Sequence, residues 1–314
     1  MNQVAMNEHQ TSTKKRQSPS PRRLAVAIAL LGLGPMSWFS NSLAAEAEAA
    51  RKKPKPVACS AIITKCGCTI TTTGFYQVQQ KLGAPGSLNE LDNSCIAVSA
   101  PRVVLYLDGM SIINKITSGG IGIHLNSSAI NSYIEGAGAT IAGWSFGVED
   151  NASNSIITNL SADNNDTAGV LVQQVTGVSI SNVGSHNNGS YGIWLNGATF
   201  SQVGGGIIGP TASGIQNNGL AGIQVSTLSK PAAPSNNVRI FGNCVTGNGG
   251  AGIALQPGVT NTAVSGNEVT GNSGGDLADS NNNCGSNLWF GNAFGTGNPT
   301  TCVGQTVMLN VCSN

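Results

Sequence analysis

The sequence has few charged and few aromatic residues, and both shortages limit the classes of function that fit it. Charged side chains make up 9% of the 314 residues and aromatic ones 5%. Beyond residue 57, six basic side chains face eleven acidic ones, which gives a net charge of −5. No basic stripe remains there for a phosphate backbone, so nucleic-acid binding is not expected. A surface rich in Gly, Asn, Ser and Thr suits an extracellular protein that handles uncharged, hydroxyl-rich ligands, and it equally suits a soluble rod.

The sequence also lacks a clear membrane span. The apolar run at 24–34 has 11 residues, against about 20 for a membrane-spanning helix. It follows a basic start and precedes small residues at Ser42, Ala44 and Ala45, an order typical of a secretory signal peptide. A retained anchor is the alternative. We predict a signal peptide over 1–45, a basic, proline-rich linker over 46–58 and a mature domain over 59–314, secreted or periplasmic and monomeric.

Seven short phrases recur along this mature domain. Each starts at an anchor residue, glycine in the first six, and the anchors are 25, 22, 23, 30, 30 and 24 residues apart. The phrases lie at 122–125, 147–149, 169–172, 192–195, 222–225, 252–255 and 276–277. A period of this size is typical of stacked repeat units rather than of one globular core. Each phrase alternates apolar and variable residues, as a short strand does.

An asparagine stands four residues before the anchor in five successive repeats. These residues are Asn165, Asn188, Asn218, Asn248 and Asn272. If each repeat is one coil, their amides lie above one another and form a structural hydrogen-bonded ladder. The pattern predicts an all-β fold, a parallel β-helix of about 8–9 coils, with N-terminal coils over 59–110 and a C-terminal cap over 276–314. A leucine-rich horseshoe is the competing fold, but it needs a fixed run of leucines that this chain lacks.

All eight cysteines lie beyond the predicted signal peptide, which favours disulfides in an exported protein. Seven of them lie near the two ends of the solenoid, where bridges would hold the terminal coils. We predict a Cys284–Cys302 bridge and a second bridge from Cys66 or Cys68 to Cys95. Cys244 is interpreted as a buried free thiol. A zinc site built from Cys66, Cys68 and Cys95 is the alternative.

Several motifs outside the repeats add a resemblance. They are the segments at 66–70, 74–78, 95–98, 103–109 and 283–292. Together with the repeats they resemble bacterial exported right-handed parallel β-helix proteins of the pectin-lyase-like superfamily, over about residues 66 to 303. The resemblance implies a right-handed, single-stranded solenoid and a polysaccharide or cell-surface glycan as partner. The catalytic motifs of the galacturonan hydrolases and alginate epimerases in that superfamily are absent from this chain.

The repeats also predict which side chains face outward. Positions +1 and +3 after each anchor are mostly aliphatic and should point inward, so +2 and +4 should point outward. Asp150 breaks the inward pattern at +3, and that coil is expected to turn early. Position +2 holds His124, Glu149, Leu171, Trp194, Gln224 and Ala254, and position +4 holds Asn126, Asn151, Gln173, Asn196, Ser226 and Gln256.

These outward columns predict a ligand surface, because enzymes of the resembled superfamily lay a sugar chain on such a face. His124 and Glu149 are the candidate catalytic pair, since a carboxylate can orient an imidazole for proton transfer. Trp194 is a candidate stacking platform, and the remaining candidate substrate-binding residues offer amides: Gln224, Asn126, Asn151, Gln173 and Asn196. Alternatively, His124 and Glu149 form a solvated cross-strand pair, and a loop covers Trp194. The two 30-residue coils contain insertions that could wall a groove.

Two further polar groupings carry weaker expectations. Asp163 and His186 occupy the same column in successive coils. They are interpreted either as an acid–base or metal-binding corner or as an ordinary solvated turn. Asp276 and Asp279 are the carboxylates that suggest calcium, and they lack the ligand series of a calcium loop, so no cofactor is predicted. The function expected is polysaccharide binding, with lyase, hydrolase or epimerase activity left open. A non-catalytic, adhesin-like envelope or surface protein is the alternative.

Overall fold

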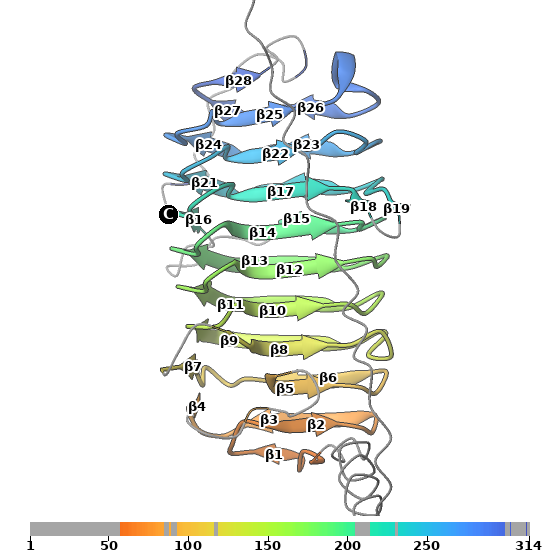
Figure 1. Ribbon diagram of the computed structural model, residues 1–314, viewed down its shortest axis with the longest axis vertical. Coiled ribbons are helices and arrows are strands. Elements are labelled where there is room, and N and C mark those ends of the chain that lie inside the picture. Colours follow the sequence, from red (N-terminus) through yellow and green to blue (C-terminus); the bar gives the residue numbers. More distant parts are fainter. Residues whose placement is uncertain are drawn as a thin grey trace, which may run out of the picture. The chain divides into compact units, whose positions relative to one another are not determined.

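The computed structural model describes residues 57–84, 88, 93–115, 119–204, 214–229, 232–298, 302 and 312. The predicted signal peptide at 1–45 and nearly all of the linker at 46–58 lie outside the described residues. What is described is a right-handed parallel β-helix of about eight turns, as the repeats and the resemblance predicted. Successive coils stack along one axis, and each adds its strands to the same sheets (Figure 1).

The anchor phrases form one side of this solenoid, a ten-stranded parallel sheet. Neighbouring strands in it come from successive coils, so residues far apart in sequence become direct neighbours. In spatial order the strands are β2 (Cys68–Ile70), β5 (Ser94–Val98), β8 (Ile121–Leu125), β10 (Phe146–Asp150), β12 (Ala168–Gln173), β14 (Tyr191–Asn196), β17 (Ile223–Ser226), β22 (Ile253–Leu255), β25 (Leu277–Asp279) and β28 (Gly297–Asn298).

The stretches between anchors form a sixteen-stranded sheet, again with parallel pairing. Its main path is β1 (Ile62–Ile63), β3 (Gly74–Val78), β6 (Val103–Tyr106), β9 (Tyr133–Ala142), β11 (Ile156–Asp163), β13 (Ser179–His186), β15 (Gln202–Gly204), β20 (Arg239–Phe241), β23 (Ala263–Ser265) and β26 (Leu288–Phe290). The strands off this path are β4 (Leu82–Ala84), β7 (Ile112–Asn114), β16 (Gly214–Gln216), β21 (Cys244–Thr246), β24 (Glu268–Thr270) and β27 (Ala293–Phe294). An antiparallel pair, β18 (Leu228–Ser229) and β19 (Ala232–Ala233), and a 3-10 turn, η1 (Asn282–Cys284), complete the described elements.

In its middle and later coils, the sixteen-stranded sheet bends at a residue that has a positive φ. In the middle coils this residue is Asn159 (φ 57°) or Asn182 (φ 50°), and β11 and β13 continue through it. In later coils it is Gly242 (φ 63°) or Gly266 (φ 61°), which lies between two separate strands. Gly and Asn reach the left-handed region more readily than other residues, so their recurrence at this position accounts for the bend.

The interior is a stack of aliphatic side chains. The +1 residues are at most 1% exposed in every repeat: Ile123, Val148, Val170, Ile193, Ile223, Ile253 and Leu277. The anchors are glycines because the chain is crowded there. A Cβ on Gly192 would lie 2.6 Å from the carbonyl oxygen of Gly222 and 2.5 Å from a methyl group of Ile215. The predicted early turn does not occur before Asp150, because this buried residue is the last of β10 and pairs with Leu125 and Val172.

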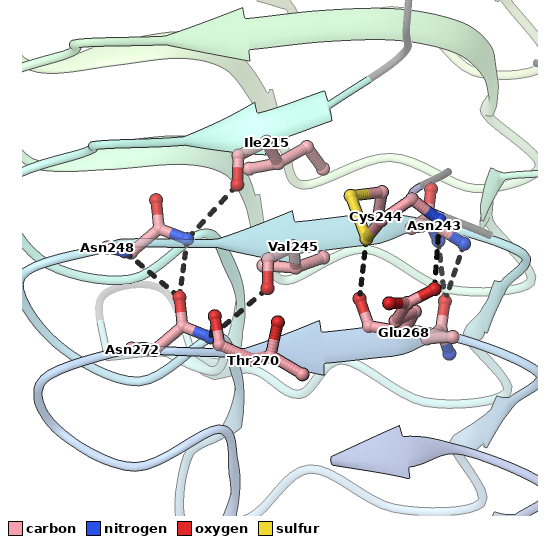
Figure 2. The surroundings of a disulfide bond; sticks show 10 residues. Ile215, Asn243, Cys244, Val245, Asn248, Glu268, Thr270 and Asn272 are labelled. Carbon is pink, nitrogen blue, oxygen red and sulfur yellow. Dashed lines mark hydrogen bonds between the residues drawn. A yellow bond between two sulfur atoms is a disulfide. The ribbon is translucent and has the colours of Figure 1, made fainter. Parts of the chain in front are cut away.

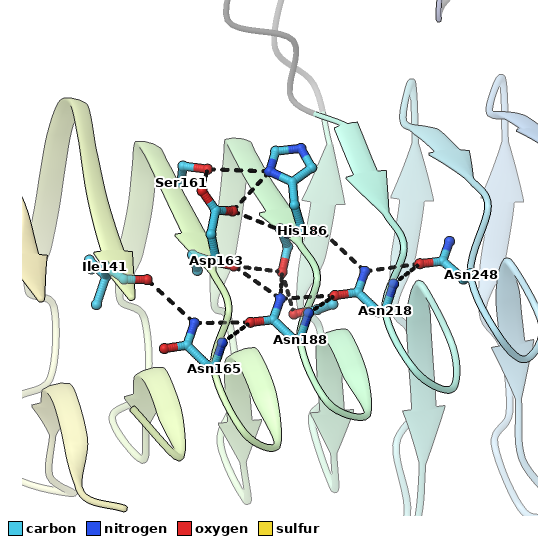
Figure 3. Close-up of polar contacts among 11 residues, drawn as sticks. Ile141, Ser161, Asp163, Asn165, His186, Asn188, Asn218 and Asn248 are labelled. Atoms are coloured by element: carbon cyan, nitrogen blue, oxygen red, sulfur yellow. Dashed lines mark hydrogen bonds and ion pairs between the residues drawn. The ribbon is translucent and has the colours of Figure 1, made fainter. Parts of the chain in front are cut away.

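The repeating asparagines form a buried hydrogen-bonded ladder along one corner of the solenoid (Figure 3). Each Nδ2 donates to the Oδ1 of the next asparagine over 2.8–3.0 Å, from Asn165 to Asn272. Each backbone N–H donates to the same oxygen over 2.9–3.1 Å. At the last rung Asp276 replaces asparagine and accepts both donors of Asn272. One amide per coil therefore satisfies two buried donors.

A second asparagine ladder, which the sequence analysis missed, lies beside the bend of the later coils. Asn243 donates to Asn267, and Asn267 donates to Asn292, each over 2.9 Å. These three residues directly follow Gly242, Gly266 and Gly291, the positive-φ residues of the bend. The recurring Gly-Asn pair at 242–243, 266–267 and 291–292 was the signal available in the sequence.

The disulfides confirm two predictions and correct two others. Cys66–Cys95 and Cys284–Cys302 are present, and Cys68 pairs with Cys59. The zinc alternative is therefore wrong, because its three sulfurs are all in disulfides. Cys244 is not a free thiol but is bonded to Cys312, 68 residues away in sequence. The Cys312 N–H donates to the Glu268 carboxylate over 2.9 Å, so Cys312 lies beside β24. Figure 2 shows Glu268 next to Cys244.

Replacement of one ladder residue tests how much the ladder stabilises the fold. In Asn218→Ala, the backbone N–H and the Nδ2 of buried Asn188 lose their common acceptor. A buried donor without a partner costs about 1–3 kcal/mol. We expect the free energy of unfolding, measured by urea denaturation, to fall by at least about 2 kcal/mol. Gln216→Ala, half-buried in the same coil, is the control and should change it by less than about 0.5 kcal/mol. Equal losses in the two variants would contradict this account.

Candidate functional site

The outward face of the ten-stranded sheet carries the predicted +2 column in the expected order. Parallel pairing places Glu149 between His124 and Leu171, and it places Trp194 between Leu171 and Gln224. Trp194 and Gln224 are half-buried, so neither side chain is part of the interior. Leu171 is only 3% exposed, although the alternation placed it outside. Ala254, at the end of the column, is 5% exposed. The column is therefore a set of accessible side chains with two covered positions, Leu171 and Ala254.

A shallow, open groove of about 680 Å³ lies over β14 and β17 and beside the residues that follow β22. The Trp194 indole is 4.8 Å from the Tyr191 ring, centroid to centroid, and its Nε1 donates to Ser226 Oγ over 2.8 Å. Ser226 in turn donates to Asn196 Oδ1 over 3.0 Å, so the indole is held in place from two sides. No lining residue is charged: they are Tyr191, Trp194, Asn196, Gln224, Ser226, Thr227, Leu228, Gln256 and Pro257.

One wall of this groove comes from an insertion. Thr227 and Leu228 directly follow β17, and Leu228 begins the antiparallel pair β18–β19. This segment belongs to one of the two 30-residue coils in which the sequence indicated insertions. Pro257, after β22, belongs to the next coil. Thr227 and Leu228 of the 30-residue coil therefore lie beside the outward face that holds Trp194.

The candidate catalytic pair is bridged by a third predicted residue. Asn151 Nδ2 lies 3.0 Å from Glu149 Oε1 and 3.2 Å from His124 Nε2. His124 and Glu149 are register neighbours on β8 and β10, as the repeat alignment predicted. Neither of them lines the groove around Trp194. The three residues form a compact polar cluster two to three coils away from the indole.

A buried carboxylate lies next to this polar cluster. Asp150 is fully buried, its Oδ1 accepts the N–H of Ala152 over 2.9 Å, and its Oδ2 accepts the hydroxyl of Ser155. Burial raises the pKa of Asp150 to about 6, although Ser155, Ala152 and the nearby His124 each act to lower it. An ionisable group therefore occupies an inward position that is aliphatic in most other coils.

The remaining predicted binding amides divide into two groups. Asn196 and Gln224 line the groove, and Gln256 Nε2 lies 3.4 Å from Gln224 Oε1 across one coil boundary. Asn126 instead stabilises the turn that follows β8, because its side chain donates to Ser99 and accepts a hydrogen bond from the N–H of Ser128. Gln173 pairs with Asn196 in register and is half-buried, without lining the groove. The structure thus gathers part of the predicted surface into one site.

The Asp163–His186 pairing is also present in the structure. Asp163 Oδ1 lies 2.8 Å from His186 Nδ1, and Asp163 Oδ2 accepts the Ser161 hydroxyl over 2.7 Å (Figure 3). Partial burial acts to raise the pKa of Asp163, but the hydrogen bonds from His186 and Ser161 outweigh it and hold that pKa below its usual value. The cluster lies on β11 and β13, on a different sheet from Trp194.

The carboxylates that suggested calcium are used by the fold. Asp276 accepts hydrogen bonds from Asn272 and from the N–H groups of Gly295 and Thr296. Asp279 accepts from Asn281 and from the indole of Trp289. Among the described residues, no group of three or more His, Cys, Asp or Glu side chains could hold a metal ion.

Tyr191 is the main groove residue that the sequence analysis missed. It directly precedes the anchor Gly192, outside the +2 and +4 columns that were read as outward. It pairs with Ala168 on β12, and Phe146 occupies the same position one coil further on. Large aromatic residues at this position in two of the repeats were the available signal.

Comparison with known proteins supports the fold. No protein-family model and no curated protein matches the chain. The enzymatically active domain of tailspike protein 2 from bacteriophage CBA120 is 14% identical, with a TM-score of 0.51, over 74% of this chain and 38% of that one. The full-length tailspike protein 2 from Escherichia coli O157:H7 bacteriophage CAB120 is 15% identical, with a TM-score of 0.49, over 74% of this chain and 34% of that one. The periplasmic alginate epimerase AlgG is 13% identical, with a TM-score of 0.46, over 70% of this chain and 60% of that one.

The chain therefore spans about a third of the length of the tailspike protein that it matches. At these identities the likeness concerns the fold alone. This chain has a right-handed parallel β-helix fold, as the resemblance in the sequence implied.

The buried carboxylate predicts how stability depends on pH. Because the pKa of Asp150 is raised in the folded protein, folding binds a proton between the ordinary pKa of about 3.9 and about 6. Stability should therefore fall as pH rises through this window, by on the order of 3 kcal/mol for this one group. Urea unfolding at about pH 4 and about pH 7 measures it.

In Asp150→Asn this contribution should be absent. Asp163→Asn is the matched control, because Asp163 changes the stability with pH in the opposite direction to Asp150. The lowered pKa of Asp163 stabilises the fold above its ordinary pKa, and this stabilisation is lost as pH falls through the folded value. A pH profile of Asp150→Asn identical to that of the unaltered protein would contradict the assignment.

Proposed function

We propose that this protein binds an uncharged polysaccharide along the outward face of its ten-stranded sheet. The observation that carries the proposal is the groove in which the Trp194 and Tyr191 rings stand beside the amides of Gln224, Gln256 and Asn196. Aromatic faces pack against the apolar faces of sugar rings, and amides both donate to and accept from hydroxyl groups. A hydrogen bond from the indole to Ser226 holds the aromatic side chain in place before a ligand binds.

The lining of the groove favours a neutral glycan over a charged one. None of its residues carries a charge, so the groove offers no counter-ion for a uronate or a sulfate. Transfer of an unpaired charge from water to such a surface is unfavourable. Hydroxyl groups, in contrast, find side-chain amides and hydroxyls as partners along one side of the groove.

A polymer fits this surface better than a single sugar does. The column continues from Trp194 towards Glu149 and His124, and stacked coils are about 4.8 Å apart. His124 is three coils from Trp194, hence about 14 Å, which is the length of a few sugar units. The cluster of His124, Glu149 and Asn151 is therefore the candidate for proton transfer to a chain that is anchored at Trp194.

Export is part of this proposal. The four disulfides favour an oxidising compartment, either the periplasm or the extracellular space. The predicted signal peptide at 1–45 agrees with this location and lies outside the described residues. No helix in the part of the chain that the structure describes has the length and apolar character of a membrane span.

A panel of neutral and acidic polysaccharides, scored by affinity electrophoresis, tests the binding. Trp194→Ala should weaken binding of the neutral glycan at least about tenfold, because loss of a stacked aromatic contact costs on the order of 1.5 kcal/mol. Phe75→Ala is the matched control, since Phe75 is 57% exposed on the other sheet and should leave binding unchanged. Binding that survives in Trp194→Ala, or that is confined to acidic glycans, would overturn the proposal.

The same panel tests whether binding is accompanied by cleavage. Each mixture is assayed for new reducing ends, which both hydrolysis and elimination produce, and for unsaturated ends, which only elimination from a uronate produces. Ends that form with the unaltered protein and disappear in Glu149→Gln, while binding persists, would assign the proton transfer to the His124–Glu149 pair. The absence of both kinds of end with a glycan that binds would define a non-catalytic binding protein.

A further inference from the structure

A second groove lies on the sixteen-stranded sheet, at its bend. Its volume is about 380 Å³, and it runs across β9, β11 and β13. Small and polar residues line it: Gly138, Thr140, Asn159, Leu160, Ser161, Asn182, Gly184 and His186. A space of this size accommodates one or two sugar rings. It shares no lining residue with the groove around Trp194.

The groove exists because two features of the sequence coincide at the bend. Thr140, Ser161 and Gly184 are register neighbours in three successive coils, and the last of them has no side chain to fill the space. On the other side, Asn159 and Asn182 turn the chain with positive φ. Their side chains line the groove together with Thr140, Ser161 and Gly184, so it combines amides with small residues.

His186 gives this groove a chemically distinct wall. Its Nδ1 lies 2.8 Å from Asp163 Oδ1, and the carboxylate also accepts the Ser161 hydroxyl (Figure 3). Because a carboxylate accepts, Nδ1 carries the proton in the neutral imidazole, and Nε2 is left as a hydrogen-bond acceptor. No partner for Nε2 exists among the described residues, so the side chain offers an oriented acceptor to whatever occupies the groove.

Charge restricts the kind of ligand. No Lys or Arg lines the groove, and Asp163 places a negative charge directly behind His186. A second carboxylate, Glu135, lies behind the amides, because Asn159 Nδ2 donates to Glu135 Oε1 over 2.7 Å. An anionic ligand would face two carboxylates without a cation. A metal ion would find few free ligands, because both oxygens of Asp163 already accept hydrogen bonds.

We propose that this groove is a second ligand site, selective for an uncharged, hydroxyl-bearing sugar, in which His186 Nε2 accepts a hydrogen bond from a ligand hydroxyl. The amides of Asn159 and Asn182 contact further hydroxyl groups, and Asp163 is a positioning residue that fixes the tautomer of His186. The site is independent of the polysaccharide face, since its residues lie on another sheet.

The histidines provide a direct test that separates the two sites. The chain contains three: His9, His124 and His186. His124 reports on the ten-stranded sheet and His186 on the second groove. Their ring signals are assigned in NMR spectra of the full chain with His124→Ala and His186→Ala. The unaltered protein is then titrated with glucose, galactose, mannose, xylose and lactose, and with galacturonate as the anionic probe.

We expect at least one neutral sugar to shift the His186 ring signals saturably, with a dissociation constant on the order of 1 mM for so small a ligand. Galacturonate should shift them less than its neutral counterpart, galactose. The same titration in Trp194→Ala should still move His186, because the two sites share no residue. His186 signals that no neutral sugar moves, or that galacturonate moves as strongly as galactose, would overturn the proposal.

Two variants that retain His186 test the groove itself. Thr140→Phe fills the space beside Ser161 and should abolish the response. Thr246→Phe places the same side chain two coils from His186 on the same sheet and should leave the response intact. Asp163→Asn keeps the size of the side chain but not its charge, and it should weaken the response several-fold. An undiminished response in both Thr140→Phe and Asp163→Asn would overturn the proposal, and unchanged His124 signals check that each variant is folded.

Discussion

The register between successive coils is the constraint on which the rest of this structure depends. From Asn165 to Asn272 each coil contributes one asparagine to a buried corner, and two donors of each asparagine bind the Oδ1 of the next. A slip of one residue would leave those donors buried without a partner and would turn the inward aliphatic column towards solvent. The ladder and the aliphatic stack therefore favour the same alignment, and the disulfides reinforce it near both ends.

This register determines which side chains lie next to one another on the surface. Residues 22 to 30 positions apart become neighbours at the separation of adjacent strands, so each outward column is a row of functional groups. The Trp194 groove and the His186 groove are two results of the same rule on different sheets. One presents aromatic rings and amides over about 680 Å³, and the other presents an oriented imidazole over about 380 Å³. Both lack lysine and arginine, as expected of a chain so poor in charge.

Most of the fold could be predicted from the repeats. The period, the Asn165–Asn272 ladder and the inward +1 column were readable because they recur, and so was the pairing of Glu149 with His124. Features that occur only once in the sequence could not be predicted in this way. Asp150 occurs at an inward position, and nothing local showed that β10 would include it. Cys244 has no cysteine within one coil, so its bond to Cys312 depends on where the chain returns.

The sequence by itself determined the stacking, the parallel sheets and the order of side chains along each column, because these follow from alternation and period. Only the tertiary structure decided which outward residues are accessible. Leu171 and Trp194 occupy equivalent positions, yet one is covered and the other lines a groove. The structure also decided that Asp163 contacts His186 and that Tyr191 packs beside Trp194. Such contacts depend on the orientation of side chains, which the period of a repeat does not specify.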